Sequence, residues 1–401
     1  MNDRKVVVTG IGVITSNGKD KYEFFENCKK GVSGLKPCSL FDTSKFNTEY
    51  VGEIEKDYPY LPDKSDGKSR VDYIVEDCLD EMMRDANLTK EDISKMGNRA
   101  YFSFATSLAS VEKMMQFVKN RHKDNIDLEW LRQIPKLLPR IKALTGVEGS
   151  CYTTTTACTS STSAVGIAFD LIKMDRADLV IVGGVDALNE FSFYGFNSLR
   201  ALSKHKCKPF DNQRDGINIG EGGAFLVLES FDRAKKRNAK IYAEILGYGI
   251  NNDAYNITSP DPNGEGAFLS MEMALNEGRK SPHDIDYINA HGTGTILNDS
   301  MEIKAIDRIF ELVEFKVPVS STKSLIGHCL AAAGILEVVV TILSIYENIC
   351  VKNIRLNDKM ADCRNVNLIE DNENRKVNYA LSNNFAFSGN TASILIGKYK
   401  N

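Results

Sequence analysis

The sequence lacks several features that mark particular classes of protein. Its nine cysteines are scattered and form no Cys-x-x-Cys pair, which argues against zinc ribbons and thioredoxin-type redox motifs. No apolar run reaches the length of a membrane span. The first residues, 1–5, are largely polar and lack the apolar core of a signal peptide. We therefore expect a cytoplasmic protein with free thiols and no membrane span.

A large excess of one charge is also absent. The net charge is only −4 over 401 residues, which argues against general nucleic-acid binding. The hydrophobic share of 42% and the charged share of 26% are ordinary for a soluble globular protein. The chain is long enough for a large core or two fused domains.

Strand-like and helix-like segments alternate along the chain, which is typical of an α/β protein. The expected strands are Lys5–Ile14, Ala177–Gly184, Gly223–Glu229, Lys240–Gly249, Asp286–Ala290, Val377–Leu381 and Ala392–Ile396. The expected helices are Tyr22–Lys29, Tyr73–Asn87, Val165–Lys173, Phe268–Glu277 and Leu330–Tyr346.

The second part of the chain repeats the pattern of the first. The strand and glycine turn at Lys240–Gly249 resemble the opening strand, and the helix after Cys158 corresponds to the helix after His328. This repetition predicts two similar halves, 1–239 and 240–401, related by a pseudo-twofold axis. The region near 105–144 breaks the α/β pattern and is predicted to be an insertion on the first half.

Cys158 is the first candidate for chemistry. It lies in a run of hydroxyl residues, Tyr152–Ala164, at the start of a predicted helix. The partial positive charge at a helix N-terminus favours a thiolate over a thiol. A buried core cysteine is the alternative, because free cysteines are among the most buried residues. The hydroxyl run argues against an apolar core, so we predict an activated nucleophile.

Two histidines downstream also lie among small residues. The glycines after His291 allow a ligand to approach the backbone, and the hydroxyls of Thr293 and Thr295 can bind an amide-bearing arm. This run lacks the Gly-Lys-Ser/Thr ending of a nucleotide loop. His328 directly precedes an apolar helix, whose N-terminus would keep the ring neutral and useful for stabilising an oxyanion.

Two charged residues accompany His328. Lys323 lies five positions before it and Glu337 nine positions after it, in an apolar stretch. Either charge would be costly to bury alone, so we predict a buried Lys323–Glu337 ion pair. A catalytic zinc held by Cys158 and the two histidines is a competing hypothesis, but the sequence shows no further ligand cluster to support such a site.

Together these runs resemble the β-ketoacyl-acyl-carrier-protein synthases of the thiolase superfamily, especially the type II condensing enzymes. The resemblance implies a five-layered α-β-α-β-α fold with the active site between the halves. The segments that carry it span nearly the whole chain: Val7–Gly12, Gly31–Gly34, Thr156–Thr159, Pro209–Gly222, Asn289–Thr295, Val319–His328 and Asn384–Thr391.

The resemblance implies a role for each candidate residue. Cys158 would accept an acyl chain from a carrier-protein thioester, which divides one difficult carbon–carbon bond formation into two easier steps. His291 and His328 would promote loss of CO₂ from a malonyl thioester and stabilise the enolate. The backbone N–H groups of Cys158 and Phe387 would form the oxyanion hole.

Further positions match supporting parts of the family's site. Lys323 and Glu337 match its supporting Lys and Glu, and Thr293 and Thr295 would hold the phosphopantetheine arm. Phe387 would gate the passage between acyl and malonyl pockets. No resident cofactor is implied, because 4'-phosphopantetheine arrives on the carrier protein. A metal is not implied either.

The chain departs from the family at the gate. The usual Gly-Phe-Gly-Gly reads Ala386-Phe387-Ser388-Gly389 here, so the loop is expected to be stiffer. This gate and Gly216–Gly220 look more like ketosynthases of specialised polyketide or polyene pathways. A fatty-acid role and a polyketide role therefore both stay open, as does the acyl chain length.

The resemblance also implies partners. Carrier proteins are acidic, so docking calls for a basic patch. A second subunit is expected, either a copy of this chain or a homologous chain-length-factor-like protein. Two other functions are a non-catalytic partner of that kind, which would not need Cys158, and a thiolase, which should have a second Cys in place of His328. Candidates for the basic patch are Lys64, Lys68, Arg70, Arg200, Lys204, Lys206 and Lys208.

Overall fold

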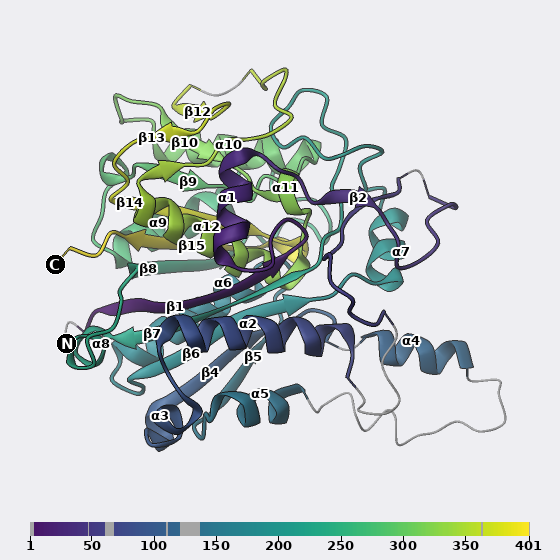
Figure 1. The fold of residues 1–401 in the computed structure, drawn as a ribbon. Coiled ribbons are helices and arrows are strands. Elements are labelled where there is room, and N and C mark those ends of the chain that lie inside the picture. The colour runs from purple at the N-terminus through teal and green to yellow at the C-terminus, as the bar shows by residue number, and fades with distance from the viewer. Residues whose placement is uncertain are drawn as a thin grey trace.

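The computed structural model describes residues 4–46, 48–60, 68–109, 111–120, 137–361 and 364–400 (Figure 1). Within them, eleven strands form one main sheet in the order β12-β10-β9-β14-β15-β8-β1-β7-β6-β4-β5. The strands are β1 (Val6–Thr15), β4 (Ala100–Ala105), β5 (Cys151–Thr154), β6 (Leu179–Asp186), β7 (Gly222–Ser230), β8 (Ala243–Asn252), β9 (Tyr287–Asn289), β10 (Val317–Ser320), β12 (Val366–Leu368), β14 (Tyr379–Phe385) and β15 (Asn390–Gly397).

Two small two-stranded sheets and the helices complete the fold. The small sheets are β2 (Leu35–Pro37) with β3 (Tyr50–Gly52), and β11 (Ile349–Cys350) with β13 (Glu373–Asn374). The helices are α1 (Lys21–Lys30), α2 (Arg70–Ala86), α3 (Lys90–Ser94), α4 (Val111–Asn120), α5 (Leu137–Thr145), α6 (Ser160–Lys173), α7 (Glu190–Ser198), α8 (Phe231–Lys236), α9 (Glu265–Glu277), α10 (Ile296–Ile309), α11 (Lys323–Ile326) and α12 (Ala333–Glu347). Short 3₁₀ turns are η1 (Gly97–Arg99), η3 (Pro282–Asp284), η4 (Leu330–Ala332) and η5 (Phe387–Gly389).

The strand order repeats about the centre of the sheet. Outward from the centre, one half reads β1-β7-β6-β4-β5 and the other β8-β15-β14-β9-β10, with β12 as an additional strand at the outer edge of the second. In both halves the first two pairings are antiparallel and the next two are parallel. An antiparallel pairing of β1 with β8 joins the halves. The predicted pseudo-symmetric α/β fold is confirmed, while the boundary at 239/240 stays a prediction.

Helices form layers around this sheet. Helix α2 packs on β1 and β7, and α9 packs on β8 and β15. Helices α6 and α12 contact each other and also contact strands of both halves, so they form the central layer. The mainly apolar burial of these faces is the chief favourable contribution to folding. Figure 1 shows α6 and α12 in the interior, with α2 along the outside of the first half.

The opening glycine motif reflects close packing. All ten residues of β1 are buried. A Cβ atom at Gly12 would lie 1.9 Å from the carbonyl oxygen of Cys78 in α2, so only glycine lets this helix approach the strand. The glycine at the end of the Val7–Gly12 run is therefore required by packing between helix and strand.

One stretch modifies the expectation about membrane spans. Leu330–Glu347 is long and apolar enough to cross a membrane by length and composition, but 89% of this stretch is buried inside the structure. A helix that is apolar on all sides fits the core of a large protein as well as a membrane. In the fold it is the central helix α12 with its preceding turn.

The region near 105–144 has a regular place in the fold. Its described residues form α4 and α5, which lie between the parallel strands β4 and β5. Parallel strands need a crossover connection, usually a helix. In the other half, α10 connects the parallel strands β9 and β10. The described helices α4 and α5 therefore stand where the α/β pattern has a crossover, while the insertion near 105–144 stays a prediction.

Arg70 corrects the predicted docking patch. Its side chain is 1% exposed, and its Nη2 and Nε donate to Glu221 Oε1 at 2.6 Å and Oε2 at 2.7 Å. Glu221 is fully buried and also accepts from the N–H groups of Ile54 and Leu188. The prediction that Arg70 belongs to a carrier-protein surface is wrong, because the side chain is committed to this buried pair.

We expect Arg70→Ala to lower the free energy of unfolding by about 3–5 kcal/mol, because it leaves a buried carboxylate unpaired. Urea unfolding followed by circular dichroism measures this change. The control Lys204→Ala removes an exposed charge and should change stability by less than about 0.5 kcal/mol. Wild-type stability in the Arg70 variant would contradict the structural role.

Candidate active site

Cys158 lies in a tight turn directly before α6. Ala157 adopts a left-handed backbone with φ of 52°, a conformation that costs a non-glycine residue about 1 kcal/mol. The turn is held because Ser160 Oγ donates to the Ala157 carbonyl at 2.5 Å and accepts from the Thr156 N–H at 2.9 Å. The thiol is thereby placed at the start of the helix, as predicted.

The hydroxyl run has a structural explanation. Ser161 Oγ accepts from the N–H of Ile335 in α12 at 2.9 Å. Thr162 Oγ1 donates to Asn384 Oδ1 at 2.7 Å, on β14. These fully buried hydroxyls connect α6, the helix after Cys158, to elements of the second half. Their presence beside Cys158 thus follows from the junction of the two halves.

His291 follows β9, and α10 fixes its backbone. The N–H groups of His291 and Gly292 each donate to the Glu302 carboxylate at 2.8 Å. The ring Nδ1 lies 3.0 Å from Lys323 Nζ. Because an ammonium can only donate, this Nδ1 is an acceptor, and the proton of the neutral ring is on Nε2.

His328 has the same tautomer for a different reason. Its Nδ1 accepts from the Leu330 N–H at 3.0 Å. The backbone is fixed on both sides, since its N–H donates to the Asn218 carbonyl at 2.7 Å and its carbonyl accepts from Gly220 at 3.0 Å. Both neutral imidazoles therefore carry their proton on Nε2. The two rings lie 5.4 Å apart between centroids.

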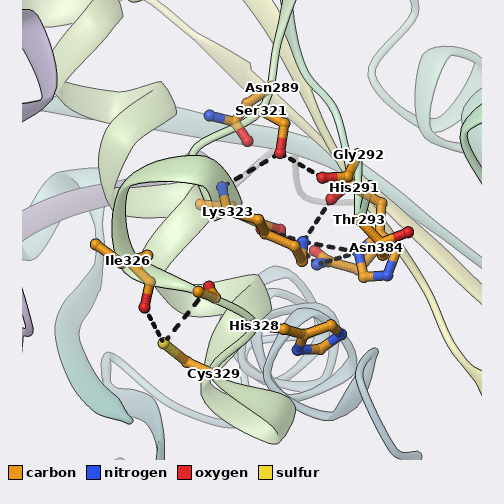
Figure 2. Close-up of polar contacts among 12 residues, drawn as sticks. Asn289, His291, Gly292, Thr293, Ser321, Lys323, Ile326, His328, Cys329 and Asn384 are labelled. Carbon is orange, nitrogen blue, oxygen red and sulfur yellow. Dashed lines mark hydrogen bonds and ion pairs between the residues drawn. The ribbon is translucent and has the colours of Figure 1, made fainter. Parts of the chain in front are cut away.

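The predicted Lys323–Glu337 ion pair is confirmed, with both side chains 2% exposed. Lys323 Nζ donates to Glu337 Oε1, to the His291 carbonyl at 2.6 Å, and lies against His291 Nδ1. Figure 2 shows the ammonium at the centre of these contacts. All three of its donors are used, which is what a buried cation requires.

Burial sets the protonation of the histidines. The pKa values of His291 and His328 lie well below the ordinary histidine value, first because burial disfavours the charged ring and then because Lys323 repels a second positive charge. His328 is neutral as predicted, but the cause is desolvation rather than a helix N-terminus. At neutral pH both side chains therefore act as N–H donors.

The thiol of Cys158 differs from the expectation of a thiolate. Burial raises its pKa from 9.0 to about 12; Lys323 opposes this change, while Glu337 and Asp186 add to it. A helix N-terminus stabilises an anion by at most about 2 kcal/mol, or about 1.5 pH units. That gain is smaller than the effect of burial, so the resting side chain is a thiol.

Two cavities meet at Cys158. The first, of about 370 Å³, contains Cys158, both histidines, Thr293 and Thr295 in its wall. The second, of about 390 Å³, has an almost wholly apolar wall that includes Cys158, Phe196, Leu199 and Leu330. Cys158 and Phe387 line both cavities. The arrangement allows two substrates to reach one sulfur from different sides.

Phe387 stands between the cavities on a constrained turn. Its ring stacks on Phe196 with centroids 5.7 Å apart. Ser388 has a left-handed φ of 67°, where a side chain is strained and glycine is not. Its N–H donates to the Ile257 carbonyl and its carbonyl accepts from Asn252 Nδ2, both at 2.7 Å. These bonds hold the gate turn in place.

The basic residues predicted to dock a carrier protein differ in their exposure and contacts. Lys64 lies outside the described residues. Lys68 pairs with Glu76 at 2.7 Å, and Lys206 is half-buried over the ring of Tyr50. Arg200 and Lys204 are exposed, Lys208 is half-buried, and Arg200 also lines the first cavity.

Sequence reasoning missed several buried groups around the site. Asn384 Nδ2 donates to Glu337 Oε2 at 2.5 Å. Asp186 accepts from the N–H of Ala331 and from Thr106 Oγ1, and Asp299 accepts from the N–H groups of Thr293 and Gly294. Asn384 begins one of the segments that carry the family resemblance, but no role was predicted for it; for Asp186 and Asp299 the sequence signal was a polar residue at the end of a buried strand or in the first turn of a helix. Among the described residues, no His, Cys, Asp and Glu side chains are grouped to hold a metal ion.

Comparison with known proteins identifies the family. Residues 3–234 match the β-ketoacyl synthase N-terminal domain, and residues 242–357 match its C-terminal domain. The chain is 32% identical to 3-oxoacyl-[acyl-carrier-protein] synthase 2 of Staphylococcus aureus (strain N315) over 99% of both chains. It is 33% identical to the protein of the same name from Coxiella burnetii, again over 99% of both.

Solved structures agree with this match. A type II polyketide ketosynthase, in complex with its acyl-carrier protein and bound to the hexaketide, superposes with a TM-score of 0.91 at 31% identity, covering 99% of this chain and 100% of that one. The ishigamide ketosynthase/chain length factor gives a TM-score of 0.92 at 29% identity with the same coverage. This chain belongs to the β-ketoacyl synthase family, and the predicted ketosynthase activity, a decarboxylative Claisen condensation that elongates an acyl chain, is confirmed.

Proposed function

We propose that Cys158 carries the acyl chain during this condensation. Its sulfur attacks the carbonyl carbon of an acyl carrier-protein thioester, a new C–S bond forms, and the old one breaks. The thiol proton leaves with the departing pantetheine sulfur, because both histidines already hold a proton on Nε2. The observation that carries the proposal is the meeting of two cavities at Cys158, beside two neutral imidazoles.

The histidines serve the second half-reaction. When the bond between the malonyl carboxylate and the adjacent carbon breaks, CO₂ leaves and an enolate forms. The Nε2–H groups of His291 and His328 stabilise the enolate oxygen in a buried site, where hydrogen bonds are strong. The enolate carbon attacks the acyl group on Cys158, and the N–H groups of Cys158 and Phe387 hold the developing oxyanion. The C–S bond to Cys158 then breaks, and the departing sulfur takes a proton from solvent.

The first cavity suits the arm of a carrier protein. Thr293 and Thr295 line it with hydroxyls 2.9 Å apart, which fits recognition of the amide groups of 4'-phosphopantetheine. That group belongs to the substrate, so the proposal includes no resident cofactor or metal. Arg200 and Lys204 are the exposed candidates for contact with an acidic carrier protein.

We expect Cys158→Ala to abolish the acyl-enzyme. Incubation with a panel of acyl-carrier-protein thioesters, followed by intact-protein mass spectrometry, should show an acyl adduct on the wild type and none on this variant. Cys151→Ala removes a half-buried thiol outside both cavities and should keep the adduct. Acylation of the Cys158 variant at the wild-type rate would refute its role as nucleophile.

The reactivity of the thiol should depend steeply on pH. Only the thiolate reacts with iodoacetamide, and its fraction grows about tenfold per pH unit well below the pKa. With a pKa of about 12, alkylation of Cys158 should keep increasing between about pH 7 and pH 9. Mass spectrometry measures the rate, with Cys158→Ala as the background. A plateau near pH 7 would instead indicate a stabilised thiolate.

A second subunit is proposed for the face beside the apolar cavity. Phe191 and Leu199 line this cavity and are 58% and 49% exposed, and adjoining apolar surface of this kind marks interaction sites. Known neighbours include a ketosynthase in complex with its chain length factor. We infer that a copy of this chain, or such a homologous subunit, closes the pocket that receives the acyl chain.

Sedimentation tests this interface. We expect the 44.6 kDa chain to assemble into a dimer, and Phe191→Asp to dissociate it by placing a charge in the apolar contact. Met174→Asp, at another exposed apolar residue, should not. A monomeric wild-type chain would exclude the homodimer, and coexpression with a homologous subunit would then test the heterodimer.

We propose a pathway from the sequence of the gate at Phe387. The Ala386-Phe387-Ser388-Gly389 sequence and the polyketide ketosynthase neighbours favour a specialised polyketide or polyene product, whereas the 3-oxoacyl-[acyl-carrier-protein] synthase 2 relatives favour fatty acids. The panel of acyl-carrier-protein thioesters described above distinguishes the two pathways by which acyl chain is transferred to Cys158.

The enzyme is proposed to work in the cytoplasm, where carrier-protein thioesters are made.

A further inference from the structure

Asn384 occupies a buried position between three parts of the site. It lies near the end of β14 and its side chain is fully buried. Its Nδ2 donates to Glu337 Oε2 at 2.5 Å and lies 3.4 Å from His291 Nδ1. In Figure 2 its amide points toward the ring of His291 beside Lys323. One side chain thus contacts both the supporting carboxylate and a proposed catalytic ring.

The acceptor-only carboxylate of Glu337 fixes the orientation of the Asn384 amide. Since an ionised carboxylate can only accept and an amide has one donor end and one acceptor end, the NH₂ group must point at Glu337. Asn384 Oδ1 then accepts from Thr162 Oγ1 at 2.7 Å, and Thr162 lies in α6, the helix that follows Cys158. The reversed amide would place its oxygen against the Glu337 carboxylate, which has no proton to donate.

These contacts place two hydrogen-bond donors beside His291 Nδ1. That nitrogen faces donors on two sides, Lys323 from α11 and Asn384 from β14. Glu337 in turn receives one hydrogen bond from Lys323 and one from Asn384 on its two oxygens. The other charged or titratable groups against His291 are the His328 ring and Glu302, which binds its backbone.

We propose that Asn384 is a positioning residue for decarboxylation: its amide holds Glu337 ionised against Lys323 and keeps Nδ1 of His291 an acceptor, so that Nε2–H faces the enolate. The inference rests on the proposed role of His291. Asn384 does not line either of the two cavities that contain Cys158 in their walls. Its removal should therefore affect the loss of CO₂ more than the acylation of Cys158.

Substitutions at Asn384 and at its neighbour Asn383 test whether loss of the Asn384 amide slows CO₂ release without slowing the acylation of Cys158. Asn383 is the neighbouring residue on β14, equally buried, but its side chain contacts Met271 and Ser393 on the other face. Asn384→Ser should slow CO₂ release from malonyl carrier-protein thioester by about 10- to 100-fold, as expected for losing a hydrogen bond to a charged group. Acylation of Cys158, measured by intact mass, should stay within about threefold, and Asn383→Ser should preserve both rates.

A second variant gives a signature that a structural role would not produce. In Asn384→Asp, two carboxyl groups lie within hydrogen-bond distance and share one proton. The protonated form still donates to Glu337, so CO₂ release should be retained at low pH. It should fall as pH rises and the shared proton is lost, whereas the wild type should stay flat because both histidines remain neutral.

The outcomes separate this inference from the proposed function. If the wild type acylates Cys158 but releases no CO₂, the proposed function of the histidines fails. If the wild type releases CO₂ and Asn384→Ser slows both steps equally, or neither, the positioning role is overturned. A pH profile of Asn384→Asp that parallels the wild type overturns it as well, even where the serine variant folds poorly.

Discussion

The active site depends on one buried charge pair. An ammonium in a low-dielectric interior is tolerated only when each of its protons has a partner. Lys323 meets this condition with Glu337, the His291 carbonyl and His291 Nδ1. These partners come from α12 and the loop after β9. The need to satisfy one cation therefore fixes the relative positions of a helix, a loop and a proposed catalytic ring.

The same pair determines the chemistry available at the site. Burial first, and then the positive charge of Lys323, lower the pKa values of His291 and His328 and keep both rings neutral. Because Nδ1 of each ring is an acceptor, each ring has a single donor, Nε2–H. Such rings stabilise developing negative charge and do not supply a strong base. The protonated thiol of Cys158 fits this environment, because thiol–thioester exchange returns a proton to the departing sulfur without a separate acceptor.

The pseudo-symmetry of the fold explains how distant segments meet. Cys158 lies between β5 and α6 in one half, and His328 lies between β10 and α12 in the other. These are equivalent places in the repeated strand order. Because α6 and α12 pack together in the central layer, the starts of both helices converge. The duplicated fold thus places Cys158 and His328 at matching positions, while α11 supplies Lys323 and the turn after β9 supplies His291.

The sequence by itself determined the local features of this protein. Regular alternation of apolar runs predicted the α/β halves, and the short motifs around Cys158, His291 and His328 predicted their turns. An apolar context around Glu337 was enough to predict its pairing with Lys323. Only the tertiary structure decided which other polar groups are buried together. Arg70 lies at the start of a helix and reads as a surface charge until Glu221, far along the chain, is placed against it. Asn384 and the raised pKa of Cys158 depend likewise on neighbours from other elements, because burial and desolvation are properties of the packed molecule and leave no local pattern in the chain.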